Sequence, residues 1–408
     1  MKAIIDKNWT KFPVLFSLYI AQSVPMSFFS TVVPIIMRQG HYSLESIGLL
    51  QLVKLPWILK FLLGPLVDNT ARNMKGIRKW VLFSELFYAL IILGIGFLHL
   101  QTDFKLIIFL VILAFIASAS QDIATDIFAI RILRKSERGF GNTMQSGGSF
   151  VGSLLGTGVL LLLYQYVGWA VLMALLAVFV LLAVLPLLTY QAGGQLESVD
   201  HGKASLKDIL LFFREKSNLK RLPLLIFFYS GIIGMLAMLK PFMVDLGYDL
   251  GQIGFLSGIM GTSVAAGSTI LAGYLIKRLG IRTSFHLFSV ISILVAVYFL
   301  YLENTKPGFT ALCLGICLLW GSYGLSTVVI YTSSMNAVRK GREGTDFTVQ
   351  IVITHLSSML LTILCGKLGD RFGYAGLFTT EIFFGIFAWI LVYFNFPFHR
   401  NRVRNHEN

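Results

Sequence analysis

Residues 142–190 read NTMQSGGSFVGSLLGTGVLLLLYQYVGWAVLMALLAVFVLLAVLPLLTY, and they include no Asp, Glu, Lys or Arg. The stretch is interrupted only by the turn-like segment Gln165–Trp169, so it predicts two helices in direct succession. A helix needs roughly 20 apolar residues to cross the hydrocarbon core of a bilayer. This stretch is therefore typical of a membrane protein with several spans.

The composition of the whole chain agrees with this interpretation. Apolar residues make up 56% of the sequence and charged residues 13%. This balance suits a chain surrounded by lipid, because the helices and strands of a soluble domain would carry polar faces. The first apolar run, residues 12–37, is too long for the core of a signal peptide and has no small-residue cleavage site. We expect it to be retained as the first span.

We predict an all-α membrane protein with 12 transmembrane helices. The predicted spans are residues 12–37, 47–66, 80–99, 105–130, 142–164, 169–190, 221–244, 251–276, 283–302, 309–335, 346–366 and 375–396.

The loops between these spans predict the orientation of the chain. The loops on the side of the N-terminus carry 26 Lys and Arg residues, and the opposite loops carry 5. Basic residues accumulate in cytoplasmic loops, so both termini should face the cytoplasm. The net charge of +14 is scattered over these loops, which does not favour nucleic-acid binding.

The only long polar interior segment divides the spans into two sets of six. We expect an N-terminal bundle over residues 1–190, a cytoplasmic linker over 191–220 and a C-terminal bundle over 221–408. Two bundles with a cytoplasmic connection are typical of a transporter with a site at the bundle interface.

Several motifs resemble the major facilitator superfamily, and within it the AmpG-like branch. The loop pattern Gly64–Asp68, followed by Gly76, Arg78 and Lys79, has a partial echo at Gly273–Arg278. The branch signature is represented by the segments Ile47–Leu49, Pro56–Trp57, Lys60–Asp68, Ser118–Asp126 and Glu137–Gly139. The resemblance implies the major facilitator fold and solute transport.

The branch includes muropeptide permeases, acetyl-CoA transporters and RhtX/FptX-type siderophore importers. Pro241–Gly247 and Gly344–Thr348 resemble the siderophore importers somewhat more than the muropeptide permeases. The resemblance therefore predicts import of a muropeptide-like or ferri-siderophore solute through a bacterial inner membrane, and an acyl-CoA-type carrier is the alternative. We expect a proton-coupled monomer.

Ionisable residues inside the predicted spans are candidates for function, because each costs roughly 2.5–3.5 kcal/mol near the bilayer centre. Asp122 and Asp126 are one turn apart and lie about 12 and 6 Å from the cytoplasmic end of their span. Lys60 and Glu85 fall at similar depths. These four residues, with Asp68 of the loop motif, are the predicted gate and proton-coupling group.

Two roles remain open for this group. It could be a structural lock that closes the cytoplasmic gate, or Asp122 or Asp126 could also carry a proton. Two carboxyl groups one turn apart in a low dielectric cannot both ionise cheaply, which favours a proton-carrying role for one of them.

Other polar residues in the spans are candidates for solute binding. Lys54 lies near the centre of its span, where it could bind a substrate carboxylate or pair with an acid. Lys240 could reach the headgroups or contact an anionic cargo, and His355 could be a hydrogen-bonded wall residue or a proton carrier. The further candidates are Gln22, Gln121, Gln145, Tyr323, Tyr331 and Gln350.

An enzyme is the main alternative class. The spacing of Asp122 and Asp126 also occurs in intramembrane prenyltransferases, but these need a second acidic motif to hold Mg²⁺, and the second half has none. The chain lacks a Gly-x-x-x-x-Gly-Lys-Ser/Thr loop for ATP phosphates. We therefore expect no enzyme activity, no bound cofactor and no metal site.

Overall fold

A computed structural model describes residues 10–33, 37, 55–99, 102–190, 202–305 and 307–396. Within these ranges the regular structure is helical and includes no strand. Helices are expected for long apolar segments, because they satisfy every backbone N–H and C=O within the segment when lipid offers no partner.

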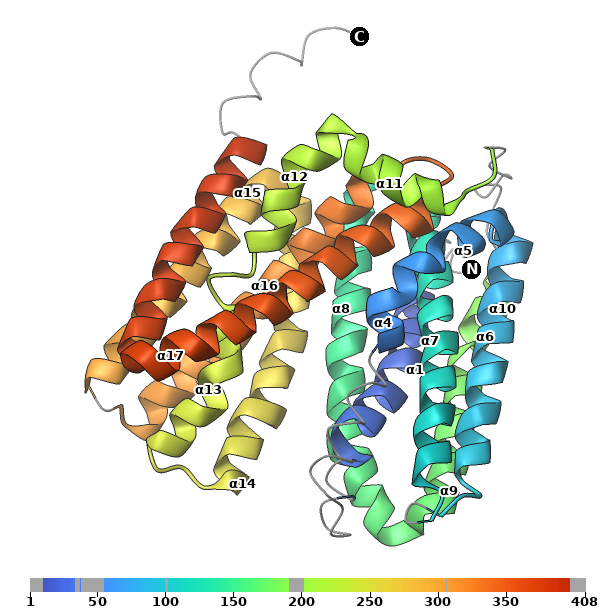
Figure 1. Cartoon of the computed structure of the whole chain (residues 1–408), viewed down its shortest axis with the longest axis horizontal. Coiled ribbons are helices and arrows are strands. Elements are labelled where there is room, and N and C mark those ends of the chain that lie inside the picture. Colours follow the sequence, from blue (N-terminus) through green and yellow to red (C-terminus); the bar gives the residue numbers. More distant parts are fainter. Residues whose placement is uncertain are drawn as a thin grey trace, which may run out of the picture. The chain divides into compact units, whose positions relative to one another are not determined.

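The chain divides into two compact units (Figure 1). The first comprises the described residues up to Leu210 together with Ala337–Val352, and the second comprises Leu211–Asn336 and the described residues from Ile353. The predicted bundle boundaries at residues 190 and 221 stay a prediction.

The helices before residue 200 all belong to the first unit. They are α1 (Lys11–Ser27), η1 (Phe28–Val32), α4 (Leu55–Leu59), η3 (Lys60–Leu62), α5 (Gly64–Thr70), α6 (Met74–Ile95), α7 (Phe104–Ile132), η4 (Lys135–Glu137), α8 (Arg138–Leu154), η5 (Leu155–Val159), α9 (Leu160–Ala183) and α10 (Leu185–Thr189).

The later helices belong mainly to the second unit, although the start of α11 and the start of α17 lie in the first. They are α11 (Leu206–Arg214), α12 (Lys216–Phe227), α13 (Ile233–Asp245), α14 (Leu250–Ile253), η6 (Gly254–Met260), α15 (Gly261–Thr305), α16 (Phe309–Asn336) and α17 (Glu343–Asn395).

Three long helices are interrupted by a glycine in the left-handed conformation. Gly168 in α9, Gly280 in α15 and Gly373 in α17 have φ values of 73°, 80° and 68°, which a residue with a Cβ rarely adopts. Each of these helices therefore consists of two helical segments joined at a kink. Figure 1 shows the red end of α17 turning back from its orange part. All three glycines fall between predicted spans.

Six helical stretches in the described residues are long and apolar enough to cross a membrane. They are Lys11–Ser30, Phe104–Ile132, Leu162–Thr189, Gly251–Thr305, Phe309–Asn336 and Glu343–Asn395. The chain is thus a membrane protein with several apolar helices. The count of 12 spans and the cytoplasmic location of both termini stay predictions.

Close packing of α1 against α8 positions the polar interior of the first unit. A Cβ at Gly148 would approach the Cβ of Tyr19, and a Cβ at Gly152 would lie 2.5 Å from the Cβ of Ser23. The four-residue spacing of these small residues lets the two backbones approach. This contact places Tyr19 of α1 beside the helix that carries Gln145.

Substitution of Gly152 by alanine should destabilise the first unit. The new Cβ would meet Ser23 at a distance that requires the helices to move apart, and overpacking typically costs about 1–3 kcal/mol. Thermal unfolding of the purified protein in detergent would measure this loss. Gly158→Ala is the matched control, because nothing lies within 4 Å of a Cβ at Gly158. Equal melting temperatures for the two variants would contradict the packing described.

Candidate functional site

A buried ion pair joins Lys60 of η3 to Asp122 of α7. The Lys60 Nζ lies 2.6 Å from Asp122 Oδ2, and the two side chains are 3% and 5% exposed. The same ammonium group lies over the ring of Trp57, 4.8 Å from its centroid. Removing one partner from such a pair leaves an uncompensated buried charge, so this interaction fixes the position of η3 on α7.

Asp126 lies one turn further along α7 and is held by hydrogen bonds from neutral side chains. Its Oδ1 accepts from the hydroxyl of Tyr19 at 2.7 Å and from the amide of Gln145 at 3.1 Å. Its Oδ2 is buried and has no hydrogen-bond partner in the described part of the chain. Within the described part of the chain the two aspartates thus differ: Asp122 is paired with a cation and Asp126 is not.

Further buried polar groups extend this interior. The side-chain amides of Gln22 on α1 and Gln121 on α7 are buried, and none of their polar atoms has a partner among the described residues. Ser146 on α8 has the same property. Buried polar groups are normally hydrogen-bonded, so this cluster has the capacity to bind water or a polar solute. We refer to Gln22, Gln121, Asp126, Gln145 and Ser146 as the polar interior.

Glu85 of α6 does not join the ion pair. It is 2% exposed, and neither of its carboxylate oxygens has a partner among the residues that the structure describes. Of the four charged residues predicted at this depth, Lys60 and Asp122 form an ion pair and Asp126 lies one turn away. Glu85 is buried and has no cation beside it in the described residues.

Asp68 at the end of α5 binds the N-terminus of α17. Its Oδ1 accepts the backbone N–H of Gly344 at 2.8 Å, and its Oδ2 accepts the N–H and the hydroxyl of Thr345 at 2.9 and 2.6 Å. Asp68 and Gly344 are 276 positions apart in the sequence. The first N–H groups of a helix have no partner within the helix, so an acidic side chain is well placed there.

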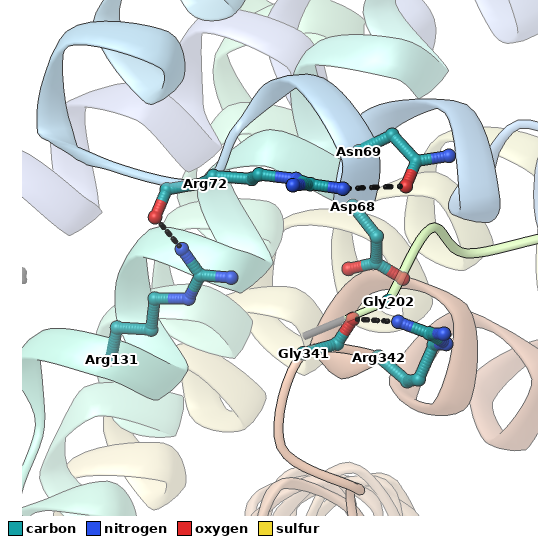
Figure 2. Close-up of a pocket in the computed structure, with 7 residues that line it drawn as sticks. All are labelled: Asp68, Asn69, Arg72, Arg131, Gly202, Gly341 and Arg342. Carbon is teal, nitrogen blue, oxygen red and sulfur yellow. Dashed lines mark hydrogen bonds between the residues drawn. The ribbon is translucent and has the colours of Figure 1, made fainter. Parts of the chain in front are cut away.

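Arginines strengthen the same region of the first unit. Arg131 of α7 lies 3.1 Å from Glu343 and donates to the backbone carbonyls of Ala71 and Arg72. Arg342 pairs with Asp208 of α11 at 3.1 Å. Figure 2 shows the small cavity that these groups surround, with Asp68 facing the loop that carries Gly341 and Arg342. The cavity is lined by Asp68, Asn69, Arg72, Arg131, Gly202, Gly341 and Arg342.

Burial raises the pKa of Asp68 to about 6 from its ordinary value of 3.8. The hydrogen bonds from Thr345 and Gly344 favour the charged form, but they offset only part of the cost of removing the carboxylate from water. Asp68 can therefore change its charge within the physiological range.

The remaining predicted solute-binding residues lie in different places. The hydroxyl of Tyr331 on α16 lies 3.1 Å from Nε2 of His355 on α17, and the ring of Tyr323 packs on Tyr229 at 5.7 Å. Lys240 on α13 is exposed.

Gln350 is buried in the first unit, and its amide donates to the backbone carbonyl of Asp346 at 3.1 Å. Lys54 lies outside the described residues.

Four residues that shape this region are not among the site residues predicted from the sequence: Tyr19, Arg131, Glu343 and Thr345. Tyr19 shares a helix face with Gln22 three residues later, and this spacing could have identified it. Glu343 and Thr345 lie in the first turn of α17, where acidic and hydroxyl side chains are common. Their presence there does not indicate a partner in another helix.

The comparison with known families identifies the class of this protein. The model of the Major Facilitator Superfamily matches residues 15–361, so the chain belongs to this superfamily of membrane transporters. The fold agrees with two solved structures. They are FucP in the outward conformation (14% identical, TM-score 0.71, covering 95% of this chain and 99% of FucP) and the proton:xylose symporter XylE (13% identical, TM-score 0.70, covering 96% and 95%).

Within the superfamily, the chain is an AmpG-like protein. It is 26% identical to the anhydromuropeptide permease of Escherichia coli over 68% of this chain and 58% of the permease. It is 22% identical to AmpG 4 of Rickettsia conorii over 96% of this chain and 98% of that relative.

Breaking the Lys60–Asp122 pair should strongly destabilise the protein. Lys60→Met or Asp122→Leu alone leaves one buried charge without a partner, which typically costs about 3–5 kcal/mol. Combining both substitutions removes both charges, so the double variant should recover most of that loss. Thermal unfolding of the four proteins forms a double-mutant cycle. Additive effects of the two substitutions would show that the pair makes no direct contribution.

Docking of Asp68 on the N-terminus of α17 should weaken as the pH rises through about 6. The docked carboxyl has the higher pKa, so the docked form retains a proton that an undocked, solvated carboxyl releases. The stabilisation that this proton gives to the docked form is complete below about pH 4 and is lost above about pH 6. Hydrogen–deuterium exchange at Gly344 and Thr345, corrected for intrinsic rates, should show greater protection in acid.

The control for this experiment is Asp68→Asn, which has no titrating group at this position and should show a flat pH profile. Equal protection of the two amides across this pH window in the unmodified protein would contradict the prediction.

Proposed function

We propose that this protein is a secondary active transporter of the bacterial inner membrane that imports a mid-sized polar or anionic solute. The observation that carries the proposal is the polar interior of the first unit, where the amides of Gln22 and Gln121 and one oxygen of Asp126 are buried without partners among the described residues. A soluble cargo needs such groups along its path, because lipid-facing helices offer it none. The proposed topology has 12 spans with both termini in the cytoplasm.

A muropeptide-like solute is the first candidate cargo. The name of the Escherichia coli relative, an anhydromuropeptide permease, supports it. A ferri-siderophore is the second candidate, because Pro241–Gly247 and Gly344–Thr348 resemble the siderophore importers. An acyl-CoA-type carrier is the further alternative within the branch.

Proton coupling is assigned to Asp126 rather than Asp122. Asp122 is already neutralised by Lys60 at 2.6 Å. Asp126 lies beside it with one oxygen held by Tyr19 and Gln145 and the other without a partner in the described residues. A carboxyl without a cation in this setting can take up a proton at little cost and release it when water or cargo enters.

Asp68, Arg131 and Glu343 form the proposed cytoplasmic lock. Asp68 and Arg131 bind the start of α17 within the first unit, and along the chain the segment Ala337–Val352 continues from α16 and into the rest of α17. Transport by alternating access would require this contact to form and break once in each cycle. Because the charge of Asp68 changes near pH 6, the lock could respond to the proton concentration in the cytoplasm.

Uptake into membrane vesicles tests the proposed cargo. Labelled anhydromuropeptide and labelled ferri-siderophore would be supplied separately, with and without an imposed pH gradient. The proposal predicts saturable uptake of one of them that the gradient increases. Absence of uptake for both, with the protein present and folded, would exclude these two candidate cargoes.

Asp126→Asn should abolish accumulation against a gradient and retain downhill exchange. Asparagine keeps the hydrogen bonds to Oδ1 but cannot carry a proton, so binding and proton coupling are separated. Asp370→Asn is the control, because Asp370 is an exposed carboxylate. Accumulation by the Asp126→Asn variant at the level of the unmodified protein would refute the assignment.

A further inference from the structure

The second unit contains a break between two consecutive helices. The chain leaves α12 at Phe227 and enters α13 at Ile233, and the five residues between them form turns rather than helix. Ile232 has φ −139° and ψ −21°, outside the helical range. Two of the first four N–H groups of α13 keep backbone partners, because Ile233 donates to the carbonyl of Tyr229 at 2.9 Å and Leu236 donates to that of Ile232 at 3.1 Å. The positive end of the helix dipole still lies at this break.

The last part of α17 packs directly on this break. A Cβ at Gly231 would lie 2.6 Å from the Cα of Gly385, so the two backbones are in contact. The hydroxyl of Ser230 lies 3.4 Å from the carbonyl oxygen of Phe384. Close contact at these two positions places the residue one turn earlier on α17, Glu381, at the N-terminus of α13.

Glu381 is fully buried against Gly234, in the first turn of α13. Its exposed fraction is 0%, and its Oε1 occupies the space that a Cβ at Gly234 would need. The carboxyl receives a hydrogen bond from the backbone of Gly234 and another, at 3.1 Å, from the thiol of Cys365 to Oε1. Its Oε2 is buried with no partner among the described residues.

No cation compensates this carboxyl in the described part of the second unit. The titratable group in contact with it is the thiol of Cys365, from the part of α17 before the Gly373 kink. The start of α13 presents the backbone of Gly234, and α15 presents the apolar Ile293 to the neighbouring Gly385. An ionisable group buried in a membrane helix without a counter-charge is a functional site by default, because its charged form is so costly.

We propose that Glu381 is a proton-binding site of this transporter, in addition to Asp126, and that its proton controls the break between α12 and α13. The carboxylic acid is neutral and fits the apolar surroundings of the break. When the O–H bond breaks and the proton leaves to water, the carboxylate requires more donors than Gly234 and Cys365 supply. The nearest source is the N-terminus of α13, whose positive dipole end favours an anion and whose N–H groups could turn to it if the turns at the break rearranged.

Loss of the proton should therefore reorganise residues 228–234. The role in the transport cycle rests on the proposed function, but proton binding by Glu381 does not.

Infrared spectroscopy of the purified full-length protein in lipid nanodiscs tests proton binding directly. The C=O stretch of a protonated carboxylic acid is separate from that of a carboxylate, so a pH titration reports each buried acid. The unmodified protein should show a band that is absent at every pH in Glu381→Gln. Glu303→Gln, which removes a less buried carboxyl of the same unit, should retain that band. Identical acid bands in the unmodified protein and Glu381→Gln would overturn the proposal.

Cys365→Ala provides a second variant in case Glu381→Gln does not fold. It leaves the carboxyl in place and removes one donor to Oε1, so the acid band should shift to higher frequency. An unshifted band would show that the protonated acid is a different residue.

Hydrogen–deuterium exchange then tests control of the break. The amides of residues 228–234 should change their exchange across the titration of the acid band in the unmodified protein and remain constant in Glu381→Gln. The same pH response in both proteins would overturn this part of the proposal. Neither measurement needs a cargo, so failure of the uptake experiment would be distinguishable from failure here.

Discussion

The ion pair between Lys60 and Asp122 is made inside an apolar helical unit, where each charge alone would be prohibitive. It requires η3 and α7 to remain in contact, because separating them would leave both charges without partners. Among the described residues, the neighbouring Asp126 has no cation of its own. One interaction thus both fixes the packing of the first unit and distinguishes two carboxyl groups that are chemically alike.

Five buried acids of this protein occupy three environments, and these environments suggest different roles. Asp122 is neutralised by a lysine, which favours a structural role. Asp68 accepts three hydrogen bonds at the start of α17, which suits a contact that forms and breaks. Asp126, Glu85 and Glu381 each have at least one oxygen without a partner in the described residues. These three acids are the strongest candidates for function, because no cation in the described residues pairs with them to offset the cost of burial.

Much of the helical architecture could be predicted from the sequence, because long apolar runs in lipid can satisfy their backbone only as helices. The kinks at Gly168, Gly280 and Gly373 fall between predicted spans, where the apolar runs are briefly interrupted. Asp122 and Asp126 were identified because their spacing places both on one helix face.

Contacts between distant segments could not be predicted in this way. The binding of Asp68 to Gly344 and Thr345 joins residues 276 or more positions apart, and no periodic pattern encodes such a distance. Glu85 shares its predicted depth with Lys60, but depth does not specify which helix face is turned toward a partner. Arg131 belongs to a run of basic residues that indicates topology, and only the fold shows that it pairs with Glu343.

The central claim is that the buried groups of the polar interior lie on a solute path. Measuring the access of water-soluble reagents to the polar interior tests this claim most directly. Gln121→Cys would be placed in a protein whose Cys313 and Cys317 are replaced by alanine, and labelled in membranes with a polar, membrane-impermeant thiol reagent. The buried Cys365 is retained because it donates to Glu381, and the same protein without the Gln121→Cys substitution gives the background. A transport path predicts that Cys at position 121 reacts and that the transported cargo slows the reaction, while Cys at the exposed apolar position Leu90 does not react. Reaction of position 121 with lipid-soluble reagents alone would contradict a solute path through the first unit.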